Sequence, residues 1–169
     1  MYKCMKSVIH KENNNLMYFL TFVVKNWYYL FDRNNRFSIL SNTLKFFQEN
    51  KGLKIYGYVF MLNHIHLIIQ SNDVIGFVRD FKRWTSRELK NNLIKYEPEV
   101  LKLFLDNDNN YNFWQDTNKP EIIENEKFFM QKFNYIFNNP VRKDYVEKPE
   151  YWKWSSANEN SEVKIEKFY

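Results

Sequence analysis

Residues 53–70, LKIYGYVFMLNHIHLIIQ, decide the fold of this chain because they encode two strands joined by a tight turn. Leu53–Met61 and His64–Gln70 are both dominated by β-branched, aromatic and other apolar residues, which favour strands. Only Leu62 and Asn63 separate them, so the two strands are predicted to pair antiparallel. This pair forms part of a sheet against which the rest of the chain must pack.

Strands and helices alternate on either side of this pair. Upstream, the apolar stretch Leu16–Lys25 predicts a central strand, and Asn34–Asn50 predicts a helix that Gly52 ends with a left-handed cap. Downstream, Val74–Tyr96 predicts a long amphipathic helix. Glu97–Asn112 is less regular, and its run of Asn and Asp indicates an exposed loop.

The C-terminal part of the chain predicts further strands around one helix. A short strand is expected near Pro120–Ile123, and Asn125 is expected to cap a helix that Pro140 stops. Alternation over Glu162–Glu166 favours an edge strand. The order β-α-β-β-α-β-α matches the split β-α-β plan of ferredoxin-like and RRM-like domains. We therefore expect an α+β fold, in which an antiparallel sheet of four to five strands carries helices mainly on one face and leaves the other for a ligand.

Composition is typical of a globular protein and is compatible with a nucleic-acid partner. The 169 residues suit one domain, residues 1–169, with a core at about 16–157 and peripheral terminal segments. A hydrophobic content of 44% argues against long disordered stretches. The net charge of +5 and the pI near 9.1 suit a nucleic-acid partner.

Two features bear on location. The single cysteine, Cys4, excludes an intramolecular disulfide framework and fits a reducing cytosol. The N-terminus lacks an apolar signal core, and no segment approaches the ~20 apolar residues that a membrane span needs. We therefore expect a cytoplasmic protein with no membrane partner.

His64 and His66 are separated by one residue on a predicted strand, so their side chains point to the same face. Ile65, Leu67 and Ile69 point to the other face, toward the expected core. Two imidazoles at this spacing can share one metal ion. A pair of half-exposed histidines near a turn is the alternative interpretation of so short a motif.

The predicted helix before Pro140 has two distinct stripes. Its apolar stripe contains Phe129, Phe133, Ile136 and Phe137, and a separate stripe at its margin contains Gln131, Tyr135 and Asn139. Tyr135 is therefore not required by the core, and the side-chain oxygen of Asn139 can reach a metal from one turn beyond it. An amphipathic helix with a half-buried tyrosine and a terminal asparagine is the alternative.

The Val74–Tyr96 helix carries a basic sector that could contact phosphates. The acids Asp80 and Glu88 lie mostly outside this sector, and the apolar side contains Val74, Phe77, Phe81 and Trp84. An ordinary solvated face remains an equal alternative. The candidate DNA contacts are Arg79, Lys82, Arg83, Arg87 and Lys90.

The chain as a whole resembles single-tyrosine HUH transposases, most closely the REP-associated tyrosine transposases. The matching segments are GYVFMLNHIHLIIQ, FKRWTSRELK, FWQ and YIFNNPVRKDYVEKPEYWKWSSA, in the family's order. By position, the resemblance implies that Tyr135 is the nucleophile and that His64, His66 and Asn139 bind a divalent metal, Mg²⁺ or Mn²⁺. It also implies single-stranded or hairpin DNA as the partner, a monomer or homodimer, and a nucleoid-associated location.

Some positions depart from the family pattern. Leu62 replaces a common proline, and residues 142–144 replace a turn that usually contains glycine. After FWQ, the run Asp116–Glu121 lacks the Asp-His pair of many members, and His10 is too remote to substitute. Glu121 is a possible extra site residue there.

The resemblance implies a metal-dependent endonuclease that cleaves and rejoins single-stranded DNA through a 5′-phosphotyrosine intermediate, at hairpin or REP-like elements. One alternative is a domesticated, cleavage-deficient hairpin-binding protein of the same fold. Another is an RRM-like module, which would bind RNA with aromatic residues on its central strands.

Overall fold

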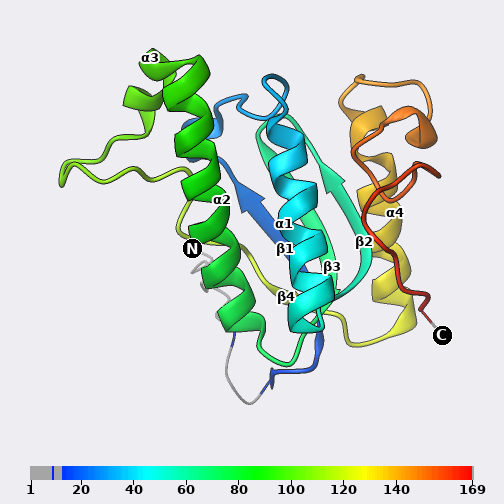
Figure 1. The fold of residues 1–169 in the computed structure, drawn as a ribbon. Coiled ribbons are helices and arrows are strands. Elements are labelled where there is room, and N and C mark those ends of the chain that lie inside the picture. The colour runs from blue at the N-terminus through cyan, green and yellow to red at the C-terminus, as the bar shows by residue number, and fades with distance from the viewer. Residues whose placement is uncertain (1–8, 10–12, 169) are drawn as a thin grey trace, which may run out of the picture.

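The computed structural model describes residue 9 and residues 13–168, so Cys4, His10 and most of the expected N-terminal tail lie outside the described residues. Its sheet has the order β2-β3-β1-β4 (Figure 1), and every pairing between these strands is antiparallel. This arrangement confirms the predicted α+β fold and its ferredoxin-like strand order. The strands are β1 (Met17–Val23), β2 (Lys54–Phe60), β3 (His64–Gln70) and β4 (Glu121–Ile122).

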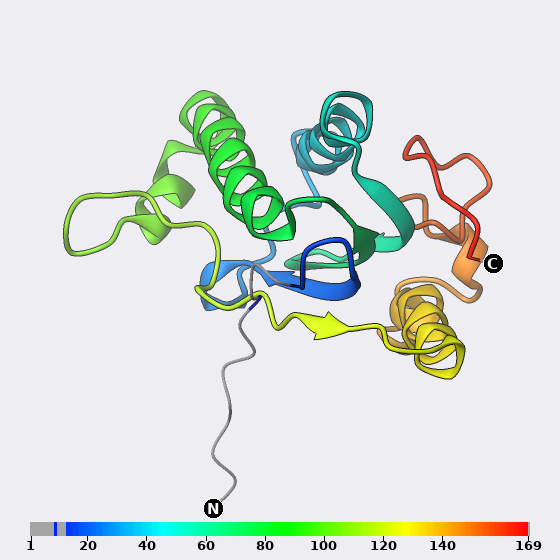
Figure 2. The same cartoon turned by 90° about the horizontal axis from the view of Figure 1, so that it is seen from below.

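Two long helices, α1 (Arg36–Lys51) and α2 (Val74–Tyr96), cover one face of the sheet (Figure 2). They close the main core against the alternate strand residues, such as Leu20, Phe22, Ile65, Leu67 and Ile69. Gly52 ends α1 with a φ of 64°, a left-handed conformation that glycine adopts without a steric penalty. The predicted cap of α1 is therefore confirmed.

A third long helix, α4 (Glu126–Arg142), packs on the opposite face of the sheet. Its buried residues Phe129 and Ile136 join Phe19, Val59 and Ile68 in a second, smaller core. This helix, whose predicted apolar stripe is confirmed, leaves only part of the second face free for a ligand.

The start of α4 follows from local chemistry, whereas its end depends on packing. At its start, Asn125 Oδ1 accepts the Phe128 N–H at 2.9 Å, as predicted for a cap. The prediction that Pro140 stops the helix is wrong, because α4 continues to Arg142. Proline in the last turn removes one backbone N–H donor, and the burial of Asn139 and Pro140 keeps this turn in place.

The connections and the tail contain little regular structure. α3 (Pro98–Leu101) is one short turn of helix, and 3-10 turns occur at residues 25–27, 102–104 and 149–151. The predicted edge strand at Glu162–Glu166 is wrong: these residues form no strand, and the backbone of the tail meets β2 at isolated hydrogen bonds, such as Glu166 N–H to the Ile55 carbonyl at 2.8 Å. No helix in the described part of the chain combines the length and apolar character needed to cross a membrane.

Candidate active site

His64 and His66 lie side by side on β3, on the face of the sheet that α4 covers in part. Their ring centroids are 4.9 Å apart. His66 is only 4% exposed and stacks on Phe19 of β1 at 5.3 Å. His64 is less buried because it lies at the start of the strand. The alternation expected for a strand therefore brings both imidazoles together.

Asn63 fixes the orientation of the His64 ring. Its amide nitrogen donates to the Trp27 carbonyl at 2.7 Å, so its oxygen is the atom that lies 2.8 Å from His64 Nδ1. Because an amide oxygen only accepts, His64 Nδ1 must carry the proton. The lone pair on Nε2 of His64 is therefore available to a metal, the arrangement typical of histidine ligands whose other nitrogen is hydrogen-bonded.

Thr21 holds the second ring in a similar way. Its hydroxyl lies 2.8 Å from His66 Nδ1, across the β1–β3 pairing. The other nitrogen, Nε2 of His66, is buried and has no hydrogen-bond partner among the described residues. Most buried polar atoms in proteins are hydrogen-bonded, so this nitrogen fits the position of a metal ligand.

Both imidazoles are held in the neutral form. Burial, followed by the charge of Lys143, lowers the pKa of His64 to about 4. Burial also lowers the pKa of His66 well below its usual value, with smaller contributions from His64, Lys132 and Lys119. Neutral imidazole is the form that coordinates metals, so the site favours coordination over protonation near pH 7.

Tyr135 projects from α4 toward the same histidines. Its ring centroid lies 5.1 Å from that of His66 and 6.0 Å from that of Phe19, edge-on in both cases. The Arg142 guanidinium carbon lies 5.6 Å from the centre of the Tyr135 ring. The fold thus brings a phenol, a guanidinium and two imidazoles together from segments far apart in the sequence.

Asn139 lies one turn beyond Tyr135 on α4 and is buried. The described residues contain no group of three or more His, Cys, Asp or Glu side chains that could hold a metal. Among the described residues, a third ligand for a metal on the histidine pair would therefore be of another type, and an amide oxygen such as that of Asn139 is a suitable type.

Glu121 occupies β4 directly opposite Phe19. Its carboxylate forms an ion pair with Lys132 of α4 at 2.7 Å, which ties β4 to the helix. It forms no three-residue cluster with the histidines. In this structure Glu121 therefore neutralises Lys132 near the site.

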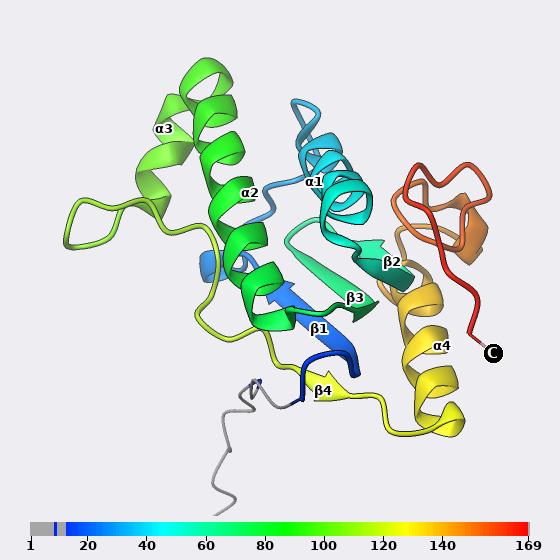
Figure 3. The same cartoon turned by 60° about the horizontal axis from the view of Figure 1, so that its bottom comes forward.

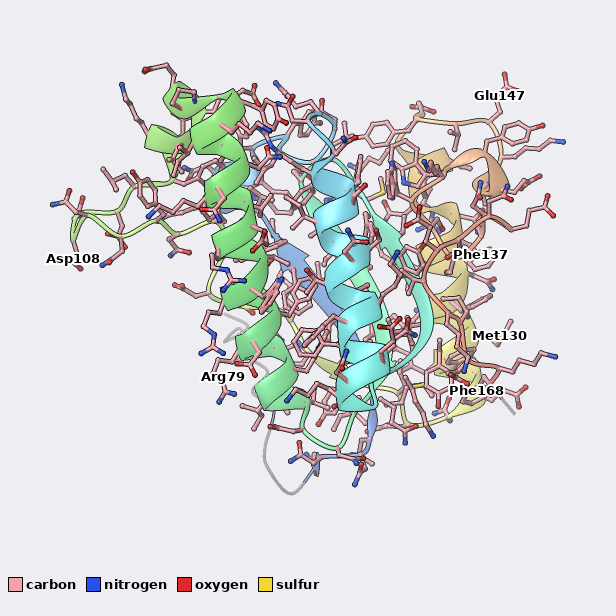
Figure 4. The ribbon with its side chains drawn as sticks, in the orientation of Figure 1. Arg79, Asp108, Met130, Phe137, Glu147 and Phe168 are labelled. Carbon is pink, nitrogen blue, oxygen red and sulfur yellow. The ribbon has the colours of Figure 1, made fainter. Side chains whose placement is uncertain are left out.

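The basic sector of α2 lies across the sheet from the histidines, since α2 covers the other face. Arg79 and Arg83 both approach Asp80, at 2.8 and 3.3 Å. In Figure 4, Arg79 projects from α2 and Phe137 lies by α4, with α1 between the two helices. The structure therefore does not place Arg79 beside the histidine pair.

The other predicted phosphate contacts on α2 differ in how far their charges are already engaged by other groups. Lys82 Nζ donates to the carbonyls of Gln115 and Asp116, and burial lowers the pKa of Lys82. Arg87 pairs with Glu88 at 3.1 Å and lies over Trp84. Trp84, expected on the apolar side, is 40% exposed because it stacks on Phe46 at the surface.

Sequence reasoning missed the cations that surround the site. Lys119, Lys132 and Lys143 are near enough to lower the histidine pKa values, and Arg142 covers Tyr135. Two of them had a signal in the sequence: Lys132 and Arg142 lie three residues before and seven after Tyr135, on the same side of a helix. Lys119 had no such signal, because only the pairing of β4 brings its segment to this face.

Comparisons with known proteins bear on the family and the fold of the chain. The model of the IS200-like transposases matches residues 12–139. None of the curated proteins matches the chain significantly. Among solved structures, a REP-associated tyrosine transposase bound to a REP hairpin is similar with a TM-score of 0.66 and 19% identity, over 92% of this chain and 82% of that one.

A candidate transposase from Deinococcus radiodurans R1 is similar with a TM-score of 0.47 and 18% identity, over 82% of this chain and 97% of that one. The similarity to the structure of the REP-associated tyrosine transposase supports the fold alone, whereas the match to the family model supports the family. Because the matched residues span most of its length, the chain belongs to the IS200-like transposase family.

Proposed function

We propose that this transposase cleaves and rejoins single-stranded DNA through a covalent bond between Tyr135 and a 5′ phosphate. The observation that carries the proposal is the contact between the Tyr135 ring and His66, whose buried Nε2 has no partner among the described residues. A nucleophile and a candidate metal ligand therefore share one face of the sheet. Together they fit metal-assisted phosphoryl transfer.

His64, His66 and Asn139 are the residues that would hold a divalent cation. Oxygen ligands suit Mg²⁺ and Mn²⁺, and two imidazoles shift the preference toward Mn²⁺. When bound, such an ion supplies positive charge to a non-bridging phosphate oxygen. Asn63 and Thr21 orient the two rings through their Nδ1 atoms.

Tyr135 supplies the nucleophilic oxygen. Its Oη forms a bond to phosphorus while the bond from phosphorus to the 3′ oxygen breaks; the phenolic proton leaves to solvent, and the 3′ oxygen takes up a proton. The nearby cations Arg142, Lys132 and Lys143 favour the approach of a phosphate and stabilise its charge. A 3′-hydroxyl that attacks the phosphotyrosine then rejoins DNA and releases Tyr135, without an external energy source.

We further propose hairpin or REP-like DNA as the substrate, and a nucleoid-associated location. The support is the shared fold with a transposase whose structure contains a REP hairpin. Within this chain the Tyr135 ring contacts His66, so a single chain contains the nucleophile and the histidine pair. We therefore propose that cleavage requires only one chain, whether the protein is a monomer or a homodimer.

The test uses a labelled hairpin oligonucleotide with single-stranded flanks. We expect cleavage and a covalent protein–DNA adduct with Mn²⁺ or Mg²⁺, and neither product from Tyr135→Phe or in EDTA. Gln131→Ala, on the same stripe of α4 but exposed, is the matched control and should cleave normally. Cleavage by Tyr135→Phe would overturn the proposed mechanism.

The alternative of a cleavage-deficient hairpin-binding protein is favoured by one observation, the lack of a third His, Cys, Asp or Glu ligand among the described residues. Suicide substrates distinguish the two functions, since only the enzyme traps a covalent adduct. The RRM-like alternative is less compatible with the structure: the aromatic residues of the strands, such as Phe19, Tyr58 and Phe60, are buried and unavailable for stacking on RNA.

A further inference from the structure

A groove joins the exposed side of α2 to the histidine pair around the end of β1. It consists of three adjoining surface pockets. The central pocket shares Ser86 and Tyr111 with the pocket that contains Lys90. It shares Asn112 and Trp114 with the pocket that contains Trp27. The groove runs from Lys90 on α2 to Trp27. Figure 3 shows the segment after the long loop passing from α2 toward β4, and this segment forms one wall.

The groove is strongly basic. Arg83 is the most exposed of its arginines, with 78% of its side chain accessible although it lies 3.3 Å from Asp80. Lys82 shapes the groove by tying α2 to the carbonyls of Gln115 and Asp116. Such an excess of cations in a groove follows a phosphate backbone. The lining cations are Lys25, Lys82, Arg83, Arg87 and Lys90, against the single acid Asp116.

Trp27 lies where the groove meets the histidine pair. The residue is 54% exposed, and its ring centroid lies 6.0 Å from that of His64. Its φ of 56° is a left-handed value that bulky residues rarely adopt, and the bond from Asn63 to its carbonyl holds it there. The fold therefore maintains a strained backbone that presents an aromatic ring beside a metal-ligand candidate.

A second aromatic residue lies further along the groove. The ring of Tyr111 is half-buried, and Lys90 Nζ lies 4.6 Å from its centre. Alternating cations and aromatic rings are the features with which proteins bind single strands, because each base has a face that can stack. Trp27 and Tyr111 line different pockets of the groove, an arrangement that fits an extended strand better than a compact ligand.

We propose that this groove binds the single-stranded segment of the DNA substrate and that Trp27 stacks on a base next to the scissile phosphate. The assignment to DNA rests on the function proposed for Tyr135. In this arrangement the DNA strand leaves the site past Trp27 and continues along α2. Cations on α2, across the sheet from the histidines, can therefore bind the same substrate.

The experiment measures binding in the Tyr135→Phe background, so that cleavage does not interfere. Fluorescence anisotropy compares a hairpin that carries a single-stranded tail with the same hairpin without a tail. We expect Trp27→Ala to weaken binding of the tailed hairpin by roughly 5- to 100-fold and to leave the blunt hairpin unaffected. Trp27→Phe should retain most of the affinity, and Tyr151→Ala, an equally exposed aromatic outside the groove, should retain all of it.

Salt dependence tests the basic part of the groove. Arg83→Ala and Lys90→Ala should each lower the slope of log affinity against log salt by about 0.7 for the tailed hairpin. Equal losses for the tailed and blunt hairpins, or no loss in any of these variants, would overturn the proposal. Tighter binding of an RNA tail would overturn the assignment to DNA. If the chain with Tyr135 intact does not cleave the hairpin, only the proposed role of Tyr135 is contradicted, because the binding comparison does not depend on cleavage.

Discussion

Among single residues, Asn63 and Thr21 matter most to the histidine pair, because each contacts the Nδ1 atom of one ring. Asn63 accepts from His64 Nδ1 and Thr21 contacts His66 Nδ1, while the buried Nε2 of His66 has no partner in the described part of the chain. Residues that orient metal ligands in this way typically change metal affinity by 10- to 100-fold when removed. Neither residue is itself a ligand, so its effect is on orientation.

We expect Asn63→Ala to weaken Mn²⁺ binding by roughly 10- to 100-fold, measured by calorimetry. Asn63→Asp keeps an acceptor for His64 but loses the donor to Trp27, so it should bind Mn²⁺ much better than Asn63→Ala. The control is Asn138→Ala, an exposed asparagine whose amide bonds only to the Asn134 carbonyl. Unchanged Mn²⁺ affinity in Asn63→Ala would show that the ring needs no such support.

The lowered histidine pKa values also predict how stability depends on pH. The unfolded chain takes up protons at an ordinary histidine pKa near 6.5, whereas folded His64 does so only at about 4. Unfolding is therefore favoured as the pH falls below about 6.5, by up to about 1.4 kcal/mol per pH unit and histidine, until the folded pKa is reached. Urea unfolding between pH 7 and 4.5 should show this loss, and His64→Gln/His66→Gln should show a shallower dependence. Equal slopes would contradict the assignment to the histidines.

At the scale of elements, the position of β4 and α4 depends in part on the ion pair between Glu121 and Lys132. Such a pair links the short edge strand to the helix that carries Tyr135. Because Glu121 is partly exposed, the pair contributes only up to about 1 kcal/mol to stability. Its effect on charge near the site is the more important one.

We expect Glu121→Gln to leave Mn²⁺ affinity unchanged and to strengthen DNA binding, because it frees the charge of Lys132. A tenfold or greater loss of Mn²⁺ affinity would instead identify Glu121 as a ligand. Glu147→Gln makes the same charge change at an exposed position, shown in Figure 4, and controls for the net charge of the protein. Calorimetry and anisotropy measure the two affinities.

At the scale of the whole molecule, α4 packs on its own sheet and brings Tyr135 to the His66 of the same chain. We therefore expect that mixing Tyr135→Phe with His64→Gln does not restore cleavage, since neither chain holds a complete site. Cleavage by the mixture would show that two chains exchange their tyrosines. The measurement is cleavage of the labelled hairpin by each variant alone and by the mixture, with the unmodified chain as the positive control.

Most elements and their order could be predicted from the sequence, because hydrophobic periodicity and helix caps are local. The bounds predicted for β3 and α2 are those observed, and Gly52 and Asn125 cap helices as expected. The tail beside β2 and the last turn at Pro140 were predicted wrongly, since both depend on packing against distant residues.

The assembly of the site, in contrast, depends on tertiary contacts. Residues such as Thr21 and Lys119 reach His66 through strand pairing and folding, which no local pattern contains. The same holds for Trp27, which a strained backbone and a bond from Asn63 place beside His64. The chemistry of His64 and Tyr135 was therefore predictable from their residue types and spacing. Their orientation, burial and surrounding charge were not, because these arise from contacts between residues far apart in the chain.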